Sequence, residues 1–215
     1  MKQNYQLILD KTIKEECENR RPSLLLHACC APCSSYVLEY LSEYFDITLY
    51  FYNPNISPRE ENDYRQEELL RLVRNMGLSD KVKVIMGEYE PEKFYTVAAG
   101  LEALPEGGAR CAKCYELRLA ETARKAAEGG YDYFTTTLSI SPYKNAEWLN
   151  SIGVAQGMEY GVKYLVSDFK KRNGYKRSCE LSAEYGLYRQ DYCGCEFSKK
   201  DAGNAGNAGD AFVAF

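Results

Sequence analysis

Short apolar runs alternate along the chain with longer segments of helical periodicity. Runs rich in β-branched and aromatic residues predict strands, and they lie at 23–28, 46–52, 81–86, 131–137 and 162–166. Apolar spacing or composition predicts helices between them, starting at Pro32 and spanning 57–76, 91–100, 111–127 and 145–158. Strands that alternate with helices predict an α/β fold, with a mainly parallel sheet and helices on both faces. Ligands of such sheets bind beyond the carboxyl ends of the strands.

Two of the predicted helices carry start signals. Pro32 suits the first turn of a helix, where a missing N–H costs nothing, so the cysteines beside it are expected at a helix N-terminus. Ser57 is followed three residues later by Glu60, with Pro58 between them. This spacing predicts a capping box with Ser57 as N-cap and Pro58 as the first helical residue.

The chain of 215 residues is long enough for one domain with its own core. We expect a single α/β domain over residues 1–200. The last fifteen residues, DAGNAGNAGDAFVAF, contain an Ala-Gly-Asn repeat that cannot bury a core, which predicts a flexible low-complexity tail over 201–215. No run approaches the ~18 apolar residues that span a bilayer, and the opening segment lacks a signal-peptide core. These features predict a cytoplasmic protein without a membrane partner.

Charge and histidine content narrow the chemistry. The formal net charge of −4 argues against a protein that coats nucleic acid indiscriminately. His27 is the single histidine, which excludes a metal site built on several imidazoles, so a metal centre must rest on thiolates or carboxylates. His27 lies inside the first predicted strand and is interpreted as a packed core residue rather than a ligand.

Nine cysteines in a cytosolic chain indicate metal or redox chemistry, because such thiols stay reduced unless they are catalytic or bound to metal. Cys29-Cys30 follows the first predicted strand, and Cys111-x-x-Cys114 opens a helix. Both pairs can meet at one sheet edge and form an all-cysteine site for zinc or an iron–sulfur cluster. Cys17 and Cys179 are interpreted as small buried residues, whereas the role of Cys33 stays open.

Cys193-Gly194-Cys195 is too closely spaced for a relaxed helical C-x-x-C. The glycine allows a tight, easily reduced disulfide, which suits a redox pair that feeds electrons inward. A second metal clamp is the alternative interpretation.

Four motifs occur in a specific order: HACCAPC after a strand, RCAKCYELRL in mid-chain, TTTLSISPYKN, and QDYCGC near the end. Over about residues 23–198 this set resembles the cobalamin-independent epoxyqueuosine reductases of the QueH type. The resemblance implies an adenine-nucleotide hydrolase-like fold, a 4Fe-4S cluster, and reduction of epoxyqueuosine to queuosine at the wobble position of tRNA. The first turn lacks the Ser-Gly-Gly loop of ATP-using relatives of that fold, so the fold alone does not justify an ATP site.

Carried onto this sequence, the resemblance implies that four cysteines hold the cluster: Cys29, Cys30, Cys111 and Cys114. It also implies that Cys193 and Cys195 are the redox-active pair. The family does not require cysteine at position 33. Cys33 is an extra ligand, a bystander, or the place where some relatives use a carboxylate for a second, mononuclear metal.

Reduction of the epoxide to an alkene needs two electrons and two protons, supplied through an electron donor whose identity the sequence does not reveal. Asp168 and Tyr143 are candidates for the proton donor, although acids and tyrosines in turns are commonly structural. Between Gly161 and Gln190 seven basic residues face three acidic ones. This surplus suggests a phosphate-binding face for tRNA, with a charged solvated helix as the alternative.

Two other classes of protein remain open. One is a thiol oxidoreductase without a cluster, and the other is a zinc-stabilised RNA-binding module without catalysis. Colour separates them from a cluster protein, since zinc has a filled d shell and gives no colour.

Overall fold

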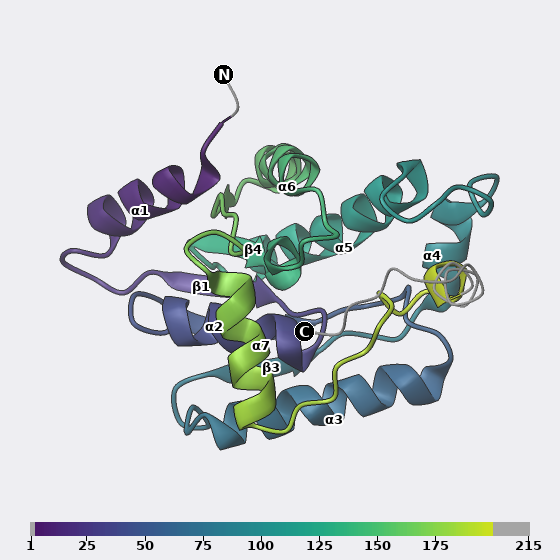
Figure 1. The fold of residues 1–215 in the computed structure, drawn as a ribbon. Helices are drawn as coiled ribbons and strands as arrows, with labels where there is room; N and C mark the ends of the chain where they lie inside the picture. The colour runs from purple at the N-terminus through teal and green to yellow at the C-terminus, as the bar shows by residue number, and fades with distance from the viewer. Residues whose placement is uncertain (1–2, 200–215) are drawn as a thin grey trace.

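The computed structural model describes residues 3–199, which contain one five-stranded parallel sheet (Figure 1). The strands are β1 (Ser23–His27), β2 (Asp46–Phe51), β3 (Lys83–Met86), β4 (Tyr133–Thr136) and β5 (Lys163–Tyr164). Their order is β3-β2-β1-β4-β5, and every neighbouring pair is parallel. This order is that of the doubly wound α/β fold, and it confirms the predicted fold class.

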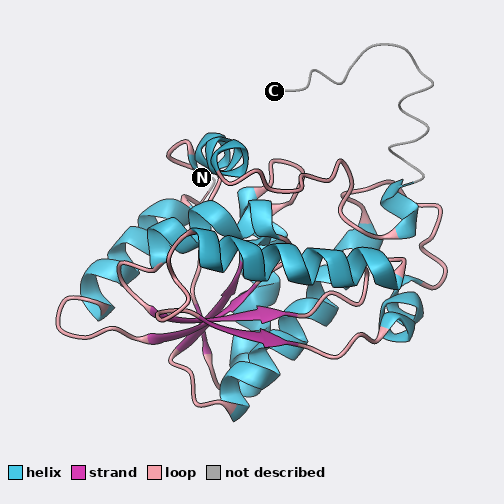
Figure 2. Cartoon of the chain, turned by 90° about the horizontal axis from the view of Figure 1, so that it is seen from below, coloured by secondary structure: helices cyan, strands magenta, loops and turns pink. Residues whose placement is uncertain are grey.

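Helices cover both faces of the sheet (Figure 2). They are α1 (Tyr5–Glu16), α2 (Ala31–Leu41), α3 (Arg59–Asn75), α4 (Pro91–Ala98), α5 (Ala109–Glu128), the short 3-10 helix η1 (Thr137–Ile140), α6 (Ala146–Tyr160) and α7 (Gly174–Glu184). Helices α5 and α6 pack together on one face, and α2 packs with α3 and α7 on the other. None of the helices in the described part of the chain has the length and apolarity to cross a bilayer.

Successive side chains along a strand point to opposite faces of the sheet, so the protein has one hydrophobic core on each face. Leu24 and Leu26 point to the α2 and α3 side, whereas Leu25 points to the α5 and α6 side and packs with Phe134. All four are at most 1% exposed, and full burial of each such side chain contributes about 1.5–3 kcal/mol to stability. A strand buried on both faces reads as a continuous apolar run, which is why SLLLH was recognisable in the sequence.

Three details differ from the sequence expectations. Helices α1 and α7 were not predicted, although Leu9 and Ile13 of α1 are buried against the α2 side of the sheet. The predicted capping box is wrong: α3 begins at Arg59 with Pro58 as N-cap, and no side chain caps it. Ser57 lies outside the helix because its N–H donates instead to the carbonyl oxygen of Gly194, at 2.9 Å.

The strand register places the first cysteines. His27 aligns with Tyr50 of β2 and with Thr136 of β4, so these three strands end at the same edge. Cys29 and Cys30 follow directly at that edge, as predicted. The predicted tail at 201–215 lies outside the described residues, and the assignment of residues 1–200 to a single domain stays a prediction.

Candidate thiol site

Seven of the nine cysteines line one cavity of about 550 Å³ at the carboxyl edge of the sheet. They arrive from three separate segments: the β1–α2 turn, the first turns of α5, and a loop that follows α7. These cavity-lining cysteines are Cys29, Cys30, Cys33, Cys111, Cys114, Cys193 and Cys195. The topology therefore brings together the three cysteine motifs that the sequence separates by up to 166 positions.

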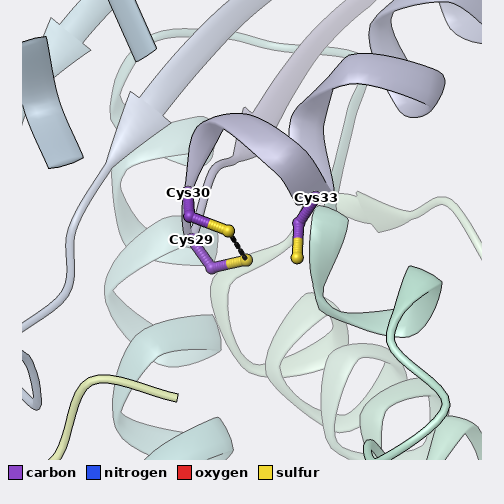
Figure 3. A group of neighbouring side chains, drawn as sticks. All are labelled: Cys29, Cys30 and Cys33. Atoms are coloured by element: carbon purple, nitrogen blue, oxygen red, sulfur yellow. Dashed lines mark hydrogen bonds between the residues drawn. The ribbon is translucent and has the colours of Figure 1, made fainter. Parts of the chain in front are cut away.

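The thiols of Cys29, Cys30 and Cys33 converge (Figure 3), and their sulfurs all lie within 4.8 Å of one another. Cys30 is the N-cap of α2 in an extended conformation, which turns the chain between strand and helix. Cys33 lies three residues further on, where a helix brings side chains back to the same face. The Sγ atoms of Cys29 and Cys30 are 3.8 Å apart, and two thiolates on one tetrahedral zinc ion lie about 3.8 Å apart.

Hydrogen bonds among these thiols separate their pKa values. Hydrogen bonds with Cys29 and, to a smaller extent, with Cys33 hold the pKa of Cys30 well below its usual range. The positive charge of Arg65 acts in the same direction. Donation to Cys30 raises the pKa of Cys29 to about 12. Interaction with Cys29 and Cys30 also raises the pKa of Cys33. These interactions favour the thiolate of Cys30, and the thiolate is the form of cysteine that binds metals.

Cys111 and Cys114 lie in the first turns of α5, three residues apart and therefore on one face of the helix. The N–H of Gly107 donates to Cys111 Sγ at 3.3 Å. Arg118 Nη1 lies 4.0 Å from Cys114 Sγ. Burial raises the pKa of Cys114 to about 11, although Arg118 counters part of this effect. Burial of Cys114 therefore favours its protonated form.

Cys193 and Cys195 face each other as two thiols in the loop after α7, with their Sγ atoms 3.7 Å apart. The hydrogen bond between Cys193 and Cys195 holds the pKa of Cys193 well below its usual range, and the charge of Lys144 adds to the effect. The same interaction raises the pKa of Cys195. A thiolate beside a protonated thiol is the reduced form of a pair that can be oxidised to a disulfide.

Charged side chains make the cavity suitable for an anion. Five basic residues and two acidic ones line it: Arg65, Arg110, Arg118, Lys144 and Arg189 against Glu106 and Asp191. Arg65 Nη2 is buried and has no hydrogen-bond partner within the described part of the chain. A cofactor held by several thiolates carries negative charge, so the donor set and the positive lining both fit an iron–sulfur cluster.

The family model described as epoxyqueuosine reductase QueH matches residues 24–201. The chain belongs to the QueH family. Curated proteins with that name are 45% identical over 203 residues in Streptococcus pyogenes serotype M1 and 47% identical over 205 residues in Staphylococcus epidermidis. Each alignment covers 93% of this chain, with 80% and 86% of the respective relative. The QueH protein of Thermotoga maritima is 38% identical over 179 residues, which are 82% of this chain and 90% of that protein.

Among solved structures, the NMN synthetase of Francisella tularensis aligns with 98% of this chain and 87% of its own, at a TM-score of 0.44 and 11% identity. The family assignment rests on the family model and the sequence relatives, which carry the name of a reductase, epoxyqueuosine reductase QueH.

His27 has the contacts of a packed core residue, in agreement with its interpretation from the sequence. It is fully buried, with Nδ1 2.8 Å from Thr136 Oγ1 and Nε2 3.1 Å from the carbonyl oxygen of Tyr52. Burial holds the pKa of His27 well below its usual range, and the positive charge of Arg118 has a smaller effect in the same direction. A neutral ring enclosed by such partners locks β1 to β4 rather than binding a metal. Cys17 and Cys179 do not belong to the lining of the cavity. Both are half-buried, so their interpretation as buried residues is wrong.

The two proton-donor candidates differ in position. Tyr143 lines the cavity and is 66% exposed, at its mouth. Asp168 is not part of the lining; its carboxylate accepts a hydrogen bond from Lys170 at 2.6 Å. Only Tyr143 is therefore placed to meet a ligand in the cavity.

Carboxylates from outside the basic 161–190 segment offset much of its positive charge. Arg177 pairs with Glu39, Arg172 with Asp10, and Lys163 with Glu16. Within the part of the chain that the structure describes, Lys171 has no carboxylate partner. The location of the tRNA-binding face on this segment stays a prediction.

Sequence reasoning missed the positive residues of the cavity wall: Arg65, Arg110, Arg118 and Lys144. Lys144 belongs to the SPYKN motif that was singled out, but nothing in its sequence context shows that its side chain is only 8% exposed. Arg118 follows Cys114 by four residues, and this helical spacing was a usable signal. Arg65 carries no such signal because its cavity partners are distant in sequence.

Proposed function

We propose that this chain is an epoxyqueuosine reductase that converts epoxyqueuosine in tRNA to queuosine, the last step of queuosine biosynthesis. The observation that carries the proposal is the convergence of seven cysteines on one positively charged cavity in a member of the QueH family. Reduction of the epoxide to an alkene takes two electrons and two protons, and the oxygen leaves as water. Thiol and iron–sulfur chemistry meets that electron demand.

Four thiols form the proposed ligand set for a 4Fe-4S cluster: Cys29, Cys30, Cys111 and Cys114. Each is at least 92% buried, and all four line the same cavity. The cluster supplies electrons one at a time. The chain contributes the enclosure, because burial of the thiols keeps water and oxidants away from the ligands.

Cys193 and Cys195 are the proposed redox-active pair. Their sulfurs are close enough to form a disulfide after a small movement, since the 3.7 Å between them must shorten to about 2.05 Å. Oxidation of the two thiols releases two electrons and two protons, which equals the demand of one epoxide. Ser198 keeps the reduced thiols in place, with its Oγ 3.1 Å from Cys193 Sγ and 3.4 Å from Cys195 Sγ.

Cys33 adds a third thiol beside Cys29 and Cys30. The three sulfurs of Cys29, Cys30 and Cys33 are close enough to ligate one mononuclear ion. We leave Cys33 outside the four proposed cluster ligands, and its position beside the vicinal pair makes it the thiol that would hold an additional metal next to the cluster.

The partners of the proposed enzyme follow from its substrate. It acts on tRNA that carries epoxyqueuosine at the wobble position, in the cytoplasm, with an electron donor that the chain does not identify. Tyr143 and Arg189 line the cavity on exposed parts of the chain. Such aromatic and basic side chains suit an unpaired nucleotide, which proteins bind by stacking and by phosphate contacts.

The test is turnover by the anaerobically reconstituted protein, supplied with a low-potential reductant and epoxyqueuosine tRNA but without cobalamin. Nucleoside mass spectrometry should show a product lighter by one oxygen, formed only when cluster and reductant are both present. Cys30→Ser should abolish it, and Cys179→Ser, outside the cavity, should not. An intact cluster with no mass loss on authentic substrate would refute the proposal. A colourless zinc protein that binds tRNA would favour the RNA-binding module instead.

A further inference from the structure

Arg65 is buried between two of the cysteine groups. It lies on α3, and its side chain is 2% exposed. Nε donates to Glu61 Oε1 at 2.7 Å, and Nη1 donates to the carbonyl oxygen of Cys193 at 3.3 Å. The guanidinium also lies over the ring of Tyr192, 5.3 Å from the centroid. These contacts fix the guanidinium plane and connect α3 to the loop that carries Cys193.

The remaining nitrogen of Arg65 has no such contact. Nη2 is buried without a hydrogen-bond partner among the described residues, and the side chain lines the same cavity as Cys29 and Cys30. A buried donor without an acceptor retains its full desolvation penalty, so an acceptor inside the cavity would complete the arrangement.

We propose that Arg65 is a positioning residue that donates from Nη2 to the thiolate-bound cofactor at Cys30 and thereby raises the reduction potential of that cofactor. Through Nη1 the same side chain holds the Cys193 loop against the site. This inference rests on the proposed function, because it takes the cavity to hold an iron–sulfur cluster.

The direction of the effect follows from charge. A one-electron reduced cluster carries one more negative charge than the oxidised cluster, so a nearby cation stabilises the reduced form more. Hydrogen bonds to the sulfurs and the net charge around a cluster set its potential. Burial strengthens the interaction because the effective dielectric constant is low. Removal of the guanidinium should therefore make the cluster harder to reduce.

The experiment is an anaerobic redox titration of the cluster-loaded protein, followed by visible absorbance, on the wild type and three variants. In Arg65→Gln, the ratio of reduced to oxidised cluster at a fixed potential should fall roughly tenfold, which is about 59 mV for one electron. Arg65→Lys keeps the charge but not the planar fork of donors, so its potential should lie between those of Arg65→Gln and the wild type.

Arg71→Gln is the matched control. Arg71 also lies on α3 and also holds carbonyl oxygens of the C-terminal part, those of Tyr185 and Gly186, at 2.9 and 2.8 Å. It does not line the cavity. Loss of Arg71 should therefore leave the potential unchanged, although it removes a comparable set of contacts.

A second measurement does not use the cluster. Alkylation of Cys193 in the apo-protein, read by peptide mass spectrometry, should be faster in Arg65→Gln than in Arg71→Gln because the loop is released. Equal potentials and equal alkylation in all four proteins would overturn the inference, even if wild-type turnover is normal. A lowered potential in a protein that never reduces the epoxide would support the inference and refute the proposed function.

Discussion

Lys144 Nζ lies 2.5 Å from Glu106 Oε1, and this ion pair joins the segment after η1 to the loop before α5. The ammonium is buried, whereas Glu106 is 30% exposed. Burial alone would lower the pKa of Lys144, but the interactions with Cys193, Tyr115 and Glu106 together outweigh burial and raise the pKa. Lys144 is therefore a positive charge in the same cavity as Cys193, and it lowers the pKa of that thiol.

Replacement of Lys144 should make Cys193 less reactive. Lys144→Met removes a charge that lowers the pKa of Cys193, so less of that thiol is ionised near neutral pH. Since the thiolate is the nucleophile, alkylation of Cys193 at pH 7 should slow by roughly tenfold for each unit by which its pKa rises above the pH. Peptide mass spectrometry after timed exposure to iodoacetamide, repeated from pH 5 to 9, measures the profile.

Lys93→Met provides the control for this experiment. Lys93 forms a similar ion pair with Glu90, but its side chain is 51% exposed and does not line the cavity. Loss of Lys93 should leave the pH profile of Cys193 alkylation unchanged. Identical profiles for wild type and Lys144→Met would show that Lys144 does not stabilise the Cys193 thiolate.

Substitution of the C-x-x-C should remove iron. Cys111→Ser and Cys114→Ser each delete one proposed ligand, and the anaerobically reconstituted variants should lose most of their iron and visible absorbance. Cys17→Ser, at the end of α1 and outside the cavity, should keep both. Full iron content in both α5 variants would exclude this helix from the ligand set.

The Cys-Gly-Cys loop should tolerate no side chain at its centre. Gly194 has φ +112°, and a Cβ there would lie 2.8 Å from Ile56 Cγ1. Gly194→Ala combines a backbone strain of about 1–3 kcal/mol with this contact, so the loop should detach and Cys193 should be alkylated faster. The comparison is Gly161→Ala, with φ +72° and no atom near the added Cβ. It should destabilise the fold without changing Cys193, and equal alkylation in both variants would contradict the prediction.

Asp132 should contribute stability that depends on pH. Its carboxylate accepts hydrogen bonds from Arg20 at 2.8 Å and from the N–H and hydroxyl of Ser23 at 2.8 and 2.9 Å. These bonds, led by that from Arg20, lower its pKa to about 2. Because the folded-state pKa is lowered, the contribution is complete above about pH 4 and is lost as the pH falls towards 2.

Denaturant titration of Asp132→Asn measures this contribution. We expect a loss of about 1 kcal/mol at pH 7, less than the pKa shift alone implies, since the side chain is 33% exposed and solvent screens the charge. The difference from the wild type should narrow as the pH falls towards 2. Asp63→Asn, an ion-pair partner of Arg59 that is 52% exposed, serves as the control with little expected effect. If the difference in the free energy of unfolding between wild type and Asp132→Asn did not change with pH, the lowered pKa of Asp132 would not contribute to stability.

The elements with strong local patterns were predictable. Strand β2 was expected at 46–52 and spans Asp46–Phe51, because its aromatic and β-branched residues are buried on both faces. Helix α5 was expected at 111–127 and begins two residues earlier, at Ala109. The carboxyl-edge position of the vicinal cysteines followed from the same pattern, since a parallel sheet allows little choice for a turn after its first strand.

What the sequence did not reveal depends on contacts between distant residues. Ser57 has the spacing of a capping box, but Gly194, far along the chain, accepts its N–H. Arg177 reads as a free charge until Glu39 appears beside it in the fold, with Nη2 2.6 Å from Oε1. Arg65 belongs to the same class. Local pattern cannot show which buried charges a fold will enclose, because long-range packing decides their partners.

The late position of Cys193 in the chain sets an order of events during synthesis. Cys29 and Cys114 leave the ribosome first, and Cys193 follows about 80 residues later, which takes about 4–16 s at the usual rate of elongation. During that interval one wall of the cavity does not yet exist. The proposed cluster ligands, the vicinal cysteines and the C-x-x-C, are then open to iron delivery before the proposed redox pair closes over them.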